Sequence, residues 1–142
     1  LDSSDKPHIA HLDSTSLTVR YVTCASAVGT CVATGATAFT AESAGSAGST
    51  STVVTTRPSI QVTSSDVKYI SWYGAGEKAL YLGTKTGSGA WSSEYIEEQS
   101  TQWPFPSSAG AYGVLLLNSS SLPVIFYRSF ENWLKYFSRE AQ

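Results

Sequence analysis

The clearest strand signal in this chain is VKYISWY, which occupies residues 67–73. β-Branched and aromatic residues dominate it, and its side chains alternate with the period of two that a β-strand requires. Residues 74–77, Gly-Ala-Gly-Glu, have the composition of a turn, and Leu80 and Leu82 then begin a returning strand. This order predicts a β-hairpin. We expect its first strand to place Val67, Tyr69, Ser71 and Tyr73 on one side, and Lys68, Ile70 and Trp72 on the other.

Shorter strand signals flank this hairpin, separated by turn residues at the short intervals of an all-β chain. Residues 17–21 alternate between apolar and polar side chains. Residues 112–118 and 122–128 lie on either side of three serines and predict a final hairpin, with Pro123 at a strand start or on an edge strand. The expected fold is mainly β, an antiparallel β-sandwich or a jelly-roll-like barrel with one short C-terminal helix.

The expected helix lies near the C-terminus, where four apolar residues follow the spacing i, i+3, i+4 and i+7 of one helical stripe. Ser129 precedes the stripe as an N-cap. A helix of about eleven residues is too short to be stable alone, so it must dock on the rest of the domain or on a partner subunit. The four residues are Phe130, Trp133, Leu134 and Phe137.

Length and composition indicate one domain with a lead-in. A chain of 142 residues buries about two-thirds of its surface on folding, which is enough for one core. Residues 1–13 are mostly polar and charged and are expected to be a linker, with residues 14–142 as a single β domain. Residues 42–52, ESAGSAGSTST, are expected to form a mobile loop. Because the chain begins with Leu1 rather than Met, we expect it to be a processed or excised piece of a longer protein.

Charge and apolar content argue against two classes of partner. The net charge is −2, and only 14% of the residues are charged, so the clustered lysines and arginines that nucleic acids require are missing. The longest strictly apolar run, residues 114–117, is far shorter than the roughly 20 residues of a membrane-spanning helix. We therefore expect no nucleic acid as a partner and no membrane insertion.

The sequence carries no catalytic motif, and we expect neither enzymatic activity nor a cofactor. Serines are abundant, but only His8 and His11 offer imidazole bases, and no Gly-x-Ser-x-Gly motif is present. The two histidines and Asp13 have the chemistry of metal ligands, but they lie on the expected linker. That position favours solvated side chains over a metal site.

Two covalent features are predicted from local patterns. Cys24 and Cys31 are seven residues apart, a spacing that fits a disulfide across the mouth of a hairpin. Two small buried thiols are the alternative. Residues 118–120, Asn-Ser-Ser, form an N-glycosylation sequon on Asn118 in an expected turn, accessible if the chain is secreted in a eukaryote.

The aromatic residues carry the one indication of function. Rings beside Gly-, Ser- and Pro-rich loops suit sugar faces or protein partners, because a ring offers a large contact area at a small entropic cost. The alternative for each ring is a place in the core. The candidates for ligand or partner binding are Trp72, Tyr73, Trp91, Tyr95, Trp103 and Phe105.

Three stretches point to one family: the linker-like residues 1–13, the threonine- and valine-rich strands of residues 15–63, and the aromatic strand–turn–strand of residues 68–85. With few charges and abundant Ser, Thr, Ala and Gly, the chain resembles the projecting (protruding) domain of a small icosahedral RNA virus coat protein, nodavirus-like or tombusvirus-like. The resemblance implies a domain without catalytic residues that lies on the virion surface. It also implies association with copies of itself as a dimer or trimer, and loops for attachment to a host receptor or glycan. The C-terminal helix departs from that pattern.

Two other classes stay open. A secreted, extracellular carbohydrate-binding module of lectin type is favoured by the aromatic residues and the expected disulfide. A surface adhesin or pilus-type subunit is favoured by the Ser/Thr/Gly content. For self-association we expect an apolar patch to which Trp72 and the proline-rigidified residues 103–106 contribute.

Overall fold

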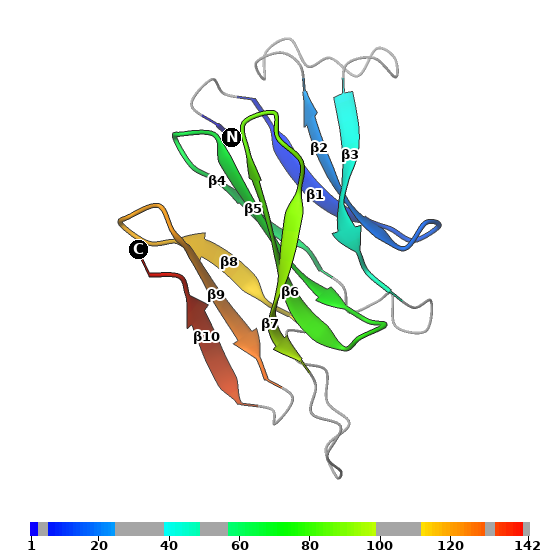
Figure 1. The fold of residues 1–142 in the computed structure, drawn as a ribbon, viewed down its shortest axis with the longest axis vertical. Helices are drawn as coiled ribbons and strands as arrows, with labels where there is room; N and C mark the ends of the chain where they lie inside the picture. Colours follow the sequence, from blue (N-terminus) through cyan, green and yellow to red (C-terminus); the bar gives the residue numbers. More distant parts are fainter. Residues whose placement is uncertain (3–5, 25–38, 49–56, 99–111, 130–132, 141–142) are drawn as a thin grey trace.

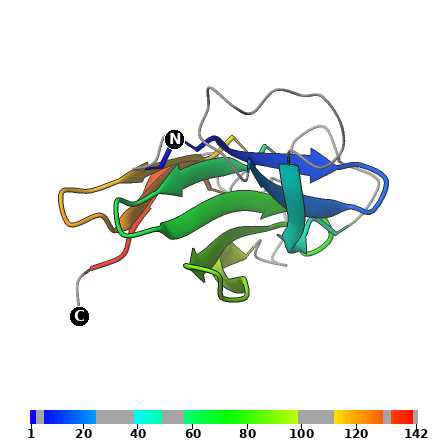
Figure 2. The same ribbon diagram turned by 90° about the horizontal axis from the view of Figure 1, so that it is seen from above.

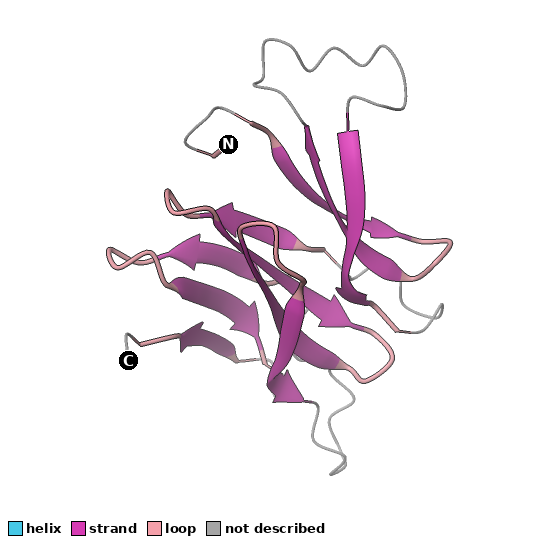
Figure 3. Cartoon of the chain, turned by 45° about the horizontal axis from the view of Figure 1, so that its top comes forward, coloured by secondary structure: helices cyan, strands magenta, loops and turns pink. Residues whose placement is uncertain are grey.

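In a computed structural model of the chain, residues 1–2, 6–24, 39–48, 57–98, 112–129 and 133–140 are described. These residues form ten strands in three antiparallel sheets, and Figure 3 shows only strands and loops among them. The prediction of mainly antiparallel β structure is confirmed, and the prediction of a C-terminal helix is wrong. None of the described residues forms a helix long and apolar enough to cross a membrane.

Sheet A contains β1 (His8–Asp13), β2 (Thr18–Cys24) and β3 (Phe39–Ser46), in that order. The prediction that residues 1–13 are a linker is wrong for β1, which pairs with β2 along its whole length. Ala10 and Leu12 of β1 are half-buried and pack against the core, whereas Ile9 and His11, which alternate with them, are exposed. Two small apolar contacts on one face are enough to hold this polar segment as an edge strand.

The N-terminal part of the expected mobile loop, residues 42–52, also belongs to the sheet. Residues 42–46 complete β3, and Ala44 and Ala47 are buried in the core at 4% and 3% exposure. Small side chains are required here, because a Cβ atom added at Gly45 would come within 2.5 Å of the Trp72 ring. The low side-chain volume therefore permits close packing of a strand against a large ring. Residues 49–52 lie outside the described residues.

Sheet B contains, in order, β4 (Ser59–Val62), β5 (Val67–Gly74), β6 (Ala79–Thr86) and β7 (Ser92–Glu98). The predicted hairpin is confirmed, because β5 and β6 pair from Val67 opposite Thr86 to Gly74 opposite Ala79. From Lys68 to Gly74 every residue of β5 is buried. A strand buried on both faces must lie in the middle of the molecule.

Sheet C contains β8 (Val114–Leu117), β9 (Pro123–Arg128) and β10 (Leu134–Ser138), with β9 in the centre. The predicted final hairpin is confirmed as β8 and β9. Pro123 is the first residue of β9, as one of the two predicted positions requires.

The segment expected to be helical forms the edge strand β10. Its apolar residues also fit a period of two, since Leu134 and Tyr136 face outward while Lys135 and Phe137 are half-buried. Pairing with β9 over five residues satisfies the backbone groups that point toward β9, and aromatic residues favour strands. A single short helix without a docking partner has no comparable stabilisation. Phe130 lies outside the described residues.

Sheet B lies between the other two sheets, as the blue, green and orange-to-red strands show in two views (Figures 1 and 2). The alternation predicted for β5 explains this arrangement, because its two faces enter two separate apolar clusters. The first cluster joins sheets A and B and contains Val19, Tyr21, Ala44, Ala47, Ile70 and Trp72. The second joins sheets B and C and contains Tyr69, Leu80, Leu82, Leu115, Ile125 and Tyr127.

Side chains link sheets B and C along both edges. At one edge, Ser59 Oγ of β4 accepts a hydrogen bond from the Leu115 N–H (3.1 Å), and Gln61 Nε2 donates one to the Leu115 carbonyl (3.2 Å). At the other, Lys135 of β10 forms an ion pair with Glu97 of β7 (3.3 Å). These links fix the inner face of sheet C against sheet B. The outer face of sheet C points away from sheet B.

Candidate functional site

Two of the predicted binding rings, Trp72 and Tyr73, lie inside the molecule. Each is 2% exposed, on opposite faces of β5. Trp72 Nε1 donates a hydrogen bond to the Ser46 carbonyl (3.0 Å), and its ring stacks on Tyr81 with centroids 5.3 Å apart. Both rings are therefore core residues, which corrects their prediction as partner-binding residues and removes Trp72 from any self-association surface.

The other predicted rings divide between partial burial and exposure. Trp91 packs against the first apolar cluster, edge-on to Tyr21, and its buried Nε1 has no hydrogen-bond partner among the described residues. Tyr95 is 58% exposed, with its ring 4.6 Å from that of Tyr81. Trp103 and Phe105 lie outside the described residues. Tyr95 is thus the single described candidate with a largely exposed ring, and one ring is a small platform for a sugar.

The residues of the predicted covalent features lie at strand ends. Cys24 ends β2 and is disulfide-bonded, and Cys31, the other cysteine of the chain, lies outside the described residues. Asn118 organises the turn between β8 and β9, where its Oδ1 accepts hydrogen bonds from the N–H groups of Ser120 (2.9 Å) and Leu122 (3.0 Å). The sequon therefore occupies a well-formed surface turn.

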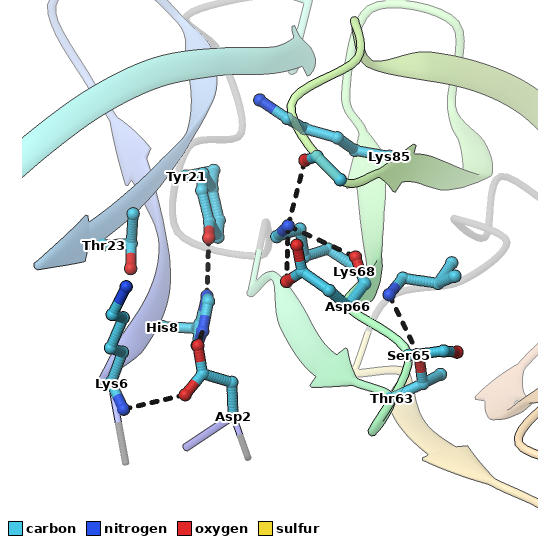
Figure 4. A network of polar contacts seen from close by, with 12 residues as sticks. Asp2, Lys6, His8, Tyr21, Thr23, Thr63, Ser65, Asp66, Lys68 and Lys85 are labelled. Carbon is cyan, nitrogen blue, oxygen red and sulfur yellow. Dashed lines mark hydrogen bonds and ion pairs between the residues drawn. The ribbon is translucent and has the colours of Figure 1, made fainter. Parts of the chain in front are cut away.

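His8, one of the two candidate bases, belongs to a closed polar network rather than to an open site (Figure 4). Its Nδ1 lies 2.5 Å from the Tyr21 hydroxyl, and its Nε2 lies 3.1 Å from Asp2 Oδ2. Tyr21 is only 2% exposed, and burial raises the pKa of its hydroxyl. The network ties the N-terminal residues to β2 through the buried Tyr21 hydroxyl.

Two lysines of sheet B are buried beside each other on paired positions of β5 and β6. Lys68 forms an ion pair with Asp66 (2.7 Å) and donates to the Gly87 carbonyl (3.1 Å), as Figure 4 shows for the Asp66 contact. Lys85 instead turns to Glu42 of β3, with contacts of 2.5 and 2.6 Å. Each ammonium group has its own carboxylate, so neither lysine is a free cationic site, and the Lys85–Glu42 contact links sheet B to sheet A.

The acidic residues of β7 are likewise used in packing. Glu97 accepts a hydrogen bond from the Tyr127 hydroxyl (2.5 Å) in addition to its ion pair with Lys135. Burial, reinforced by the Glu97 carboxylate, raises the pKa of Tyr127 above its usual range. Glu94 forms an ion pair with Arg139. Among the described residues no group of three or more His, Cys, Asp or Glu side chains could hold a metal ion.

The feature that stands apart is an exposed apolar surface on sheet C. Alternate residues of all three strands point away from sheet B, and these side chains and that of Tyr112, two residues before β8, are large and apolar but stay 42% to 80% exposed. We call this surface the outer face of sheet C. It consists of Tyr112, Val114, Leu116, Phe126, Leu134 and Tyr136.

Strand register makes the outer face continuous. Phe126 is paired with Val114 on one side and with Tyr136 on the other, so these three side chains form a row across the sheet. The rings of Phe126 and Tyr136 lie 6.2 Å apart. With roughly 150–250 Å² for a fully exposed aromatic ring and somewhat less for an aliphatic side chain, the face offers on the order of 700 Å².

Charged groups flank the outer face at its two ends. At one end the guanidinium groups of Arg57 and Arg128 lie 5.6 and 5.8 Å from the Tyr112 ring centroid. At the other end is the exposed Glu140, two residues beyond β10. None of these three groups forms an ion pair within the described part of the chain, whereas Arg20, Lys68, Lys85, Lys135 and Arg139 all do.

The sequence carries a signal for this face outside the aromatic residues predicted to bind a ligand or partner. Residues 114–117 read Val-Leu-Leu-Leu and are apolar at every position, unlike a strand with one face in water. Such a run indicates that both faces of the strand are covered, but of the four residues of β8 only Leu115 is buried.

Comparison with known proteins adds no family to this description: no protein-family model matches the chain, and no curated protein is significantly similar to it.

Proposed function

We propose that this chain is a non-enzymatic interaction domain that associates with copies of itself through the outer face of sheet C. The observation that carries the proposal is the size and continuity of that face. Soluble monomers rarely expose apolar patches beyond about 300–600 Å². An area on the order of 700 Å² approaches the roughly 800 Å² that each partner contributes to a standard interface.

This proposal agrees with the expectation drawn from the resemblance to coat-protein projecting domains. In that role the three sheets act as a β-sandwich-like scaffold on the virion surface, and the loops of this domain face a host receptor or glycan. A secreted carbohydrate-binding module remains the alternative, and exposed Tyr95 is the described residue that supports it.

Sedimentation of a matched pair of variants tests the proposal. Tyr136→Ser removes a 68% exposed ring from the outer face, and Tyr95→Ser removes a 58% exposed ring from sheet B. We expect the unchanged chain and Tyr95→Ser to form dimers or trimers as concentration rises, and Tyr136→Ser to remain monomeric at the same concentrations. Thermal unfolding of all three proteins checks that each is folded.

A strictly monomeric unchanged chain at high concentration would overturn the proposal. Loss of association in Tyr95→Ser but not in Tyr136→Ser would also contradict it, because the interface would then lie on sheet B. Binding of a simple glycan that Tyr95→Ser abolishes would favour the carbohydrate-binding module.

A further inference from the structure

Arg128 and Glu140, the charged groups at the two ends of the outer face, lie at equal distances from the level of Ile125 on β9. Arg128 is three residues from Ile125 along β9. The pairing of β10 with β9 continues past Ser138, since the Arg139 N–H donates to the Pro123 carbonyl (3.2 Å), so Glu140 comes level with Leu122. Leu122 is also three residues from Ile125, on the other side. At about 3.4 Å per residue, the cationic and anionic ends each stand about 10 Å from the level of Ile125.

We propose that two copies pack their outer faces together in antiparallel orientation, about a two-fold axis that crosses the strands at the level of Ile125. This inference rests on the proposed self-association and specifies its geometry. The rotation brings Arg128 of one copy to the level of Glu140 of the other, one strand spacing (about 4.8 Å) to the side. An arginine side chain spans that offset, and the two-fold axis makes the contact twice.

Side-chain size is complementary in the same arrangement. The axis places Phe126 opposite Val124 of the second copy, because the two residues lie equally far from Ile125. It likewise places Tyr136 opposite Ser138, two residues along the same strand. A large side chain thus meets a smaller one at these central positions of β9 and β10, as closely packed sheet faces require.

The other simple two-fold arrangement is disfavoured by the same residues. An axis along the strands would place Arg128 opposite Arg128 and Phe126 opposite Phe126. The guanidinium groups would repel each other, with no described carboxylate nearby to neutralise them. Charge therefore selects the antiparallel orientation.

Charge reversal tests this geometry by sedimentation equilibrium at low salt. Arg128→Glu alone and Glu140→Arg alone each bring like charges together twice per dimer, and each should weaken self-association about tenfold. An equimolar mixture of the two variants restores both opposite-charge contacts in the mixed dimer, as does the double variant. Both should recover the association of the unchanged chain, and the differences should shrink at high salt.

Lys78→Glu is the matched control for Arg128→Glu, since it makes the same change in net charge at an exposed turn between β5 and β6. It should leave association unchanged. If the unchanged chain associates and Tyr136→Ser does not, but the mixture fails to recover association, the antiparallel geometry is wrong and self-association stands. If the unchanged chain never associates, the proposed function itself fails.

Discussion

At the residue scale, one carboxylate holds the turn between β1 and β2. Asp13 Oδ1 accepts hydrogen bonds from the N–H groups of Thr15 (2.9 Å) and Ser16 (3.2 Å), and Oδ2 accepts one from the Ser16 hydroxyl (2.7 Å). These bonds favour the charged carboxylate, the Ser16 hydroxyl most of all. They lower the pKa of Asp13 from 3.8 to about 2.

Removing the strongest of these contacts should raise the pKa of Asp13. Ser16→Ala deletes the hydroxyl, and an NMR titration of the Asp13 carboxyl should then show a pKa closer to 3.8. Because the folded-state pKa is lowered, the stabilisation is present above pH 3.8 and is lost as the pH falls toward 2. In the variant that stabilisation should be smaller. Ser14→Ala in the same turn is the control, and an Asp13 titration unaffected by Ser16→Ala would show that the hydroxyl contributes nothing.

Also at this scale, the sequence predicted which side chains of β5 share a face, but not what covers each face. Alternation assigned Trp72 and Tyr73 to opposite sides correctly. It carries no information on whether a second sheet lies over a given side. Trp72 is covered because it lies in the cluster between sheets A and B, and sheet C packs on the other side of β5 at Tyr69. Contacts between residues so distant in sequence leave no local pattern.

At the element scale, β10 shows how two periodicities coincide in a short segment. The spacing that predicts a helical stripe places Leu134 and Phe137 on the same buried side. In the strand they lie on opposite sides: Phe137 packs into the second apolar cluster, and Leu134 is 80% exposed. Over five residues the pairing with β9 decides that the segment is a strand and not a helix, and that pairing depends on tertiary structure.

Alanine substitutions of these two residues separate strand from helix. Phe137→Ala should cost about 2 kcal/mol, less than for a fully buried ring because Phe137 is half-buried. Leu134→Ala should stay within about 0.5 kcal/mol, as for a surface substitution. Equal losses of about 2 kcal/mol or more for both residues, measured by denaturant unfolding, would place them on one buried face and contradict the strand.

At the scale of the whole molecule, the sequence predicted hairpins but not their assembly. The β5–β6 and β8–β9 hairpins follow from local alternation and turn composition. The order of the three sheets, and the fact that sheet C keeps one face uncovered, follow from contacts between distant segments. The outer face of sheet C, which carries the proposed function, is a consequence of that assembly and was not among the predicted sites.

Hydroxyl-radical footprinting of the unchanged chain over a range of protein concentrations tests the central claim most directly. Oxidation of Phe126, Leu134 and Tyr136 should fall as concentration rises, because a second copy covers the outer face of sheet C. Ile9 and Tyr95 are similarly exposed on other sheets and should be oxidised equally at all concentrations. Protection of Tyr95 or Ile9, with the three residues of sheet C unchanged, would contradict the account.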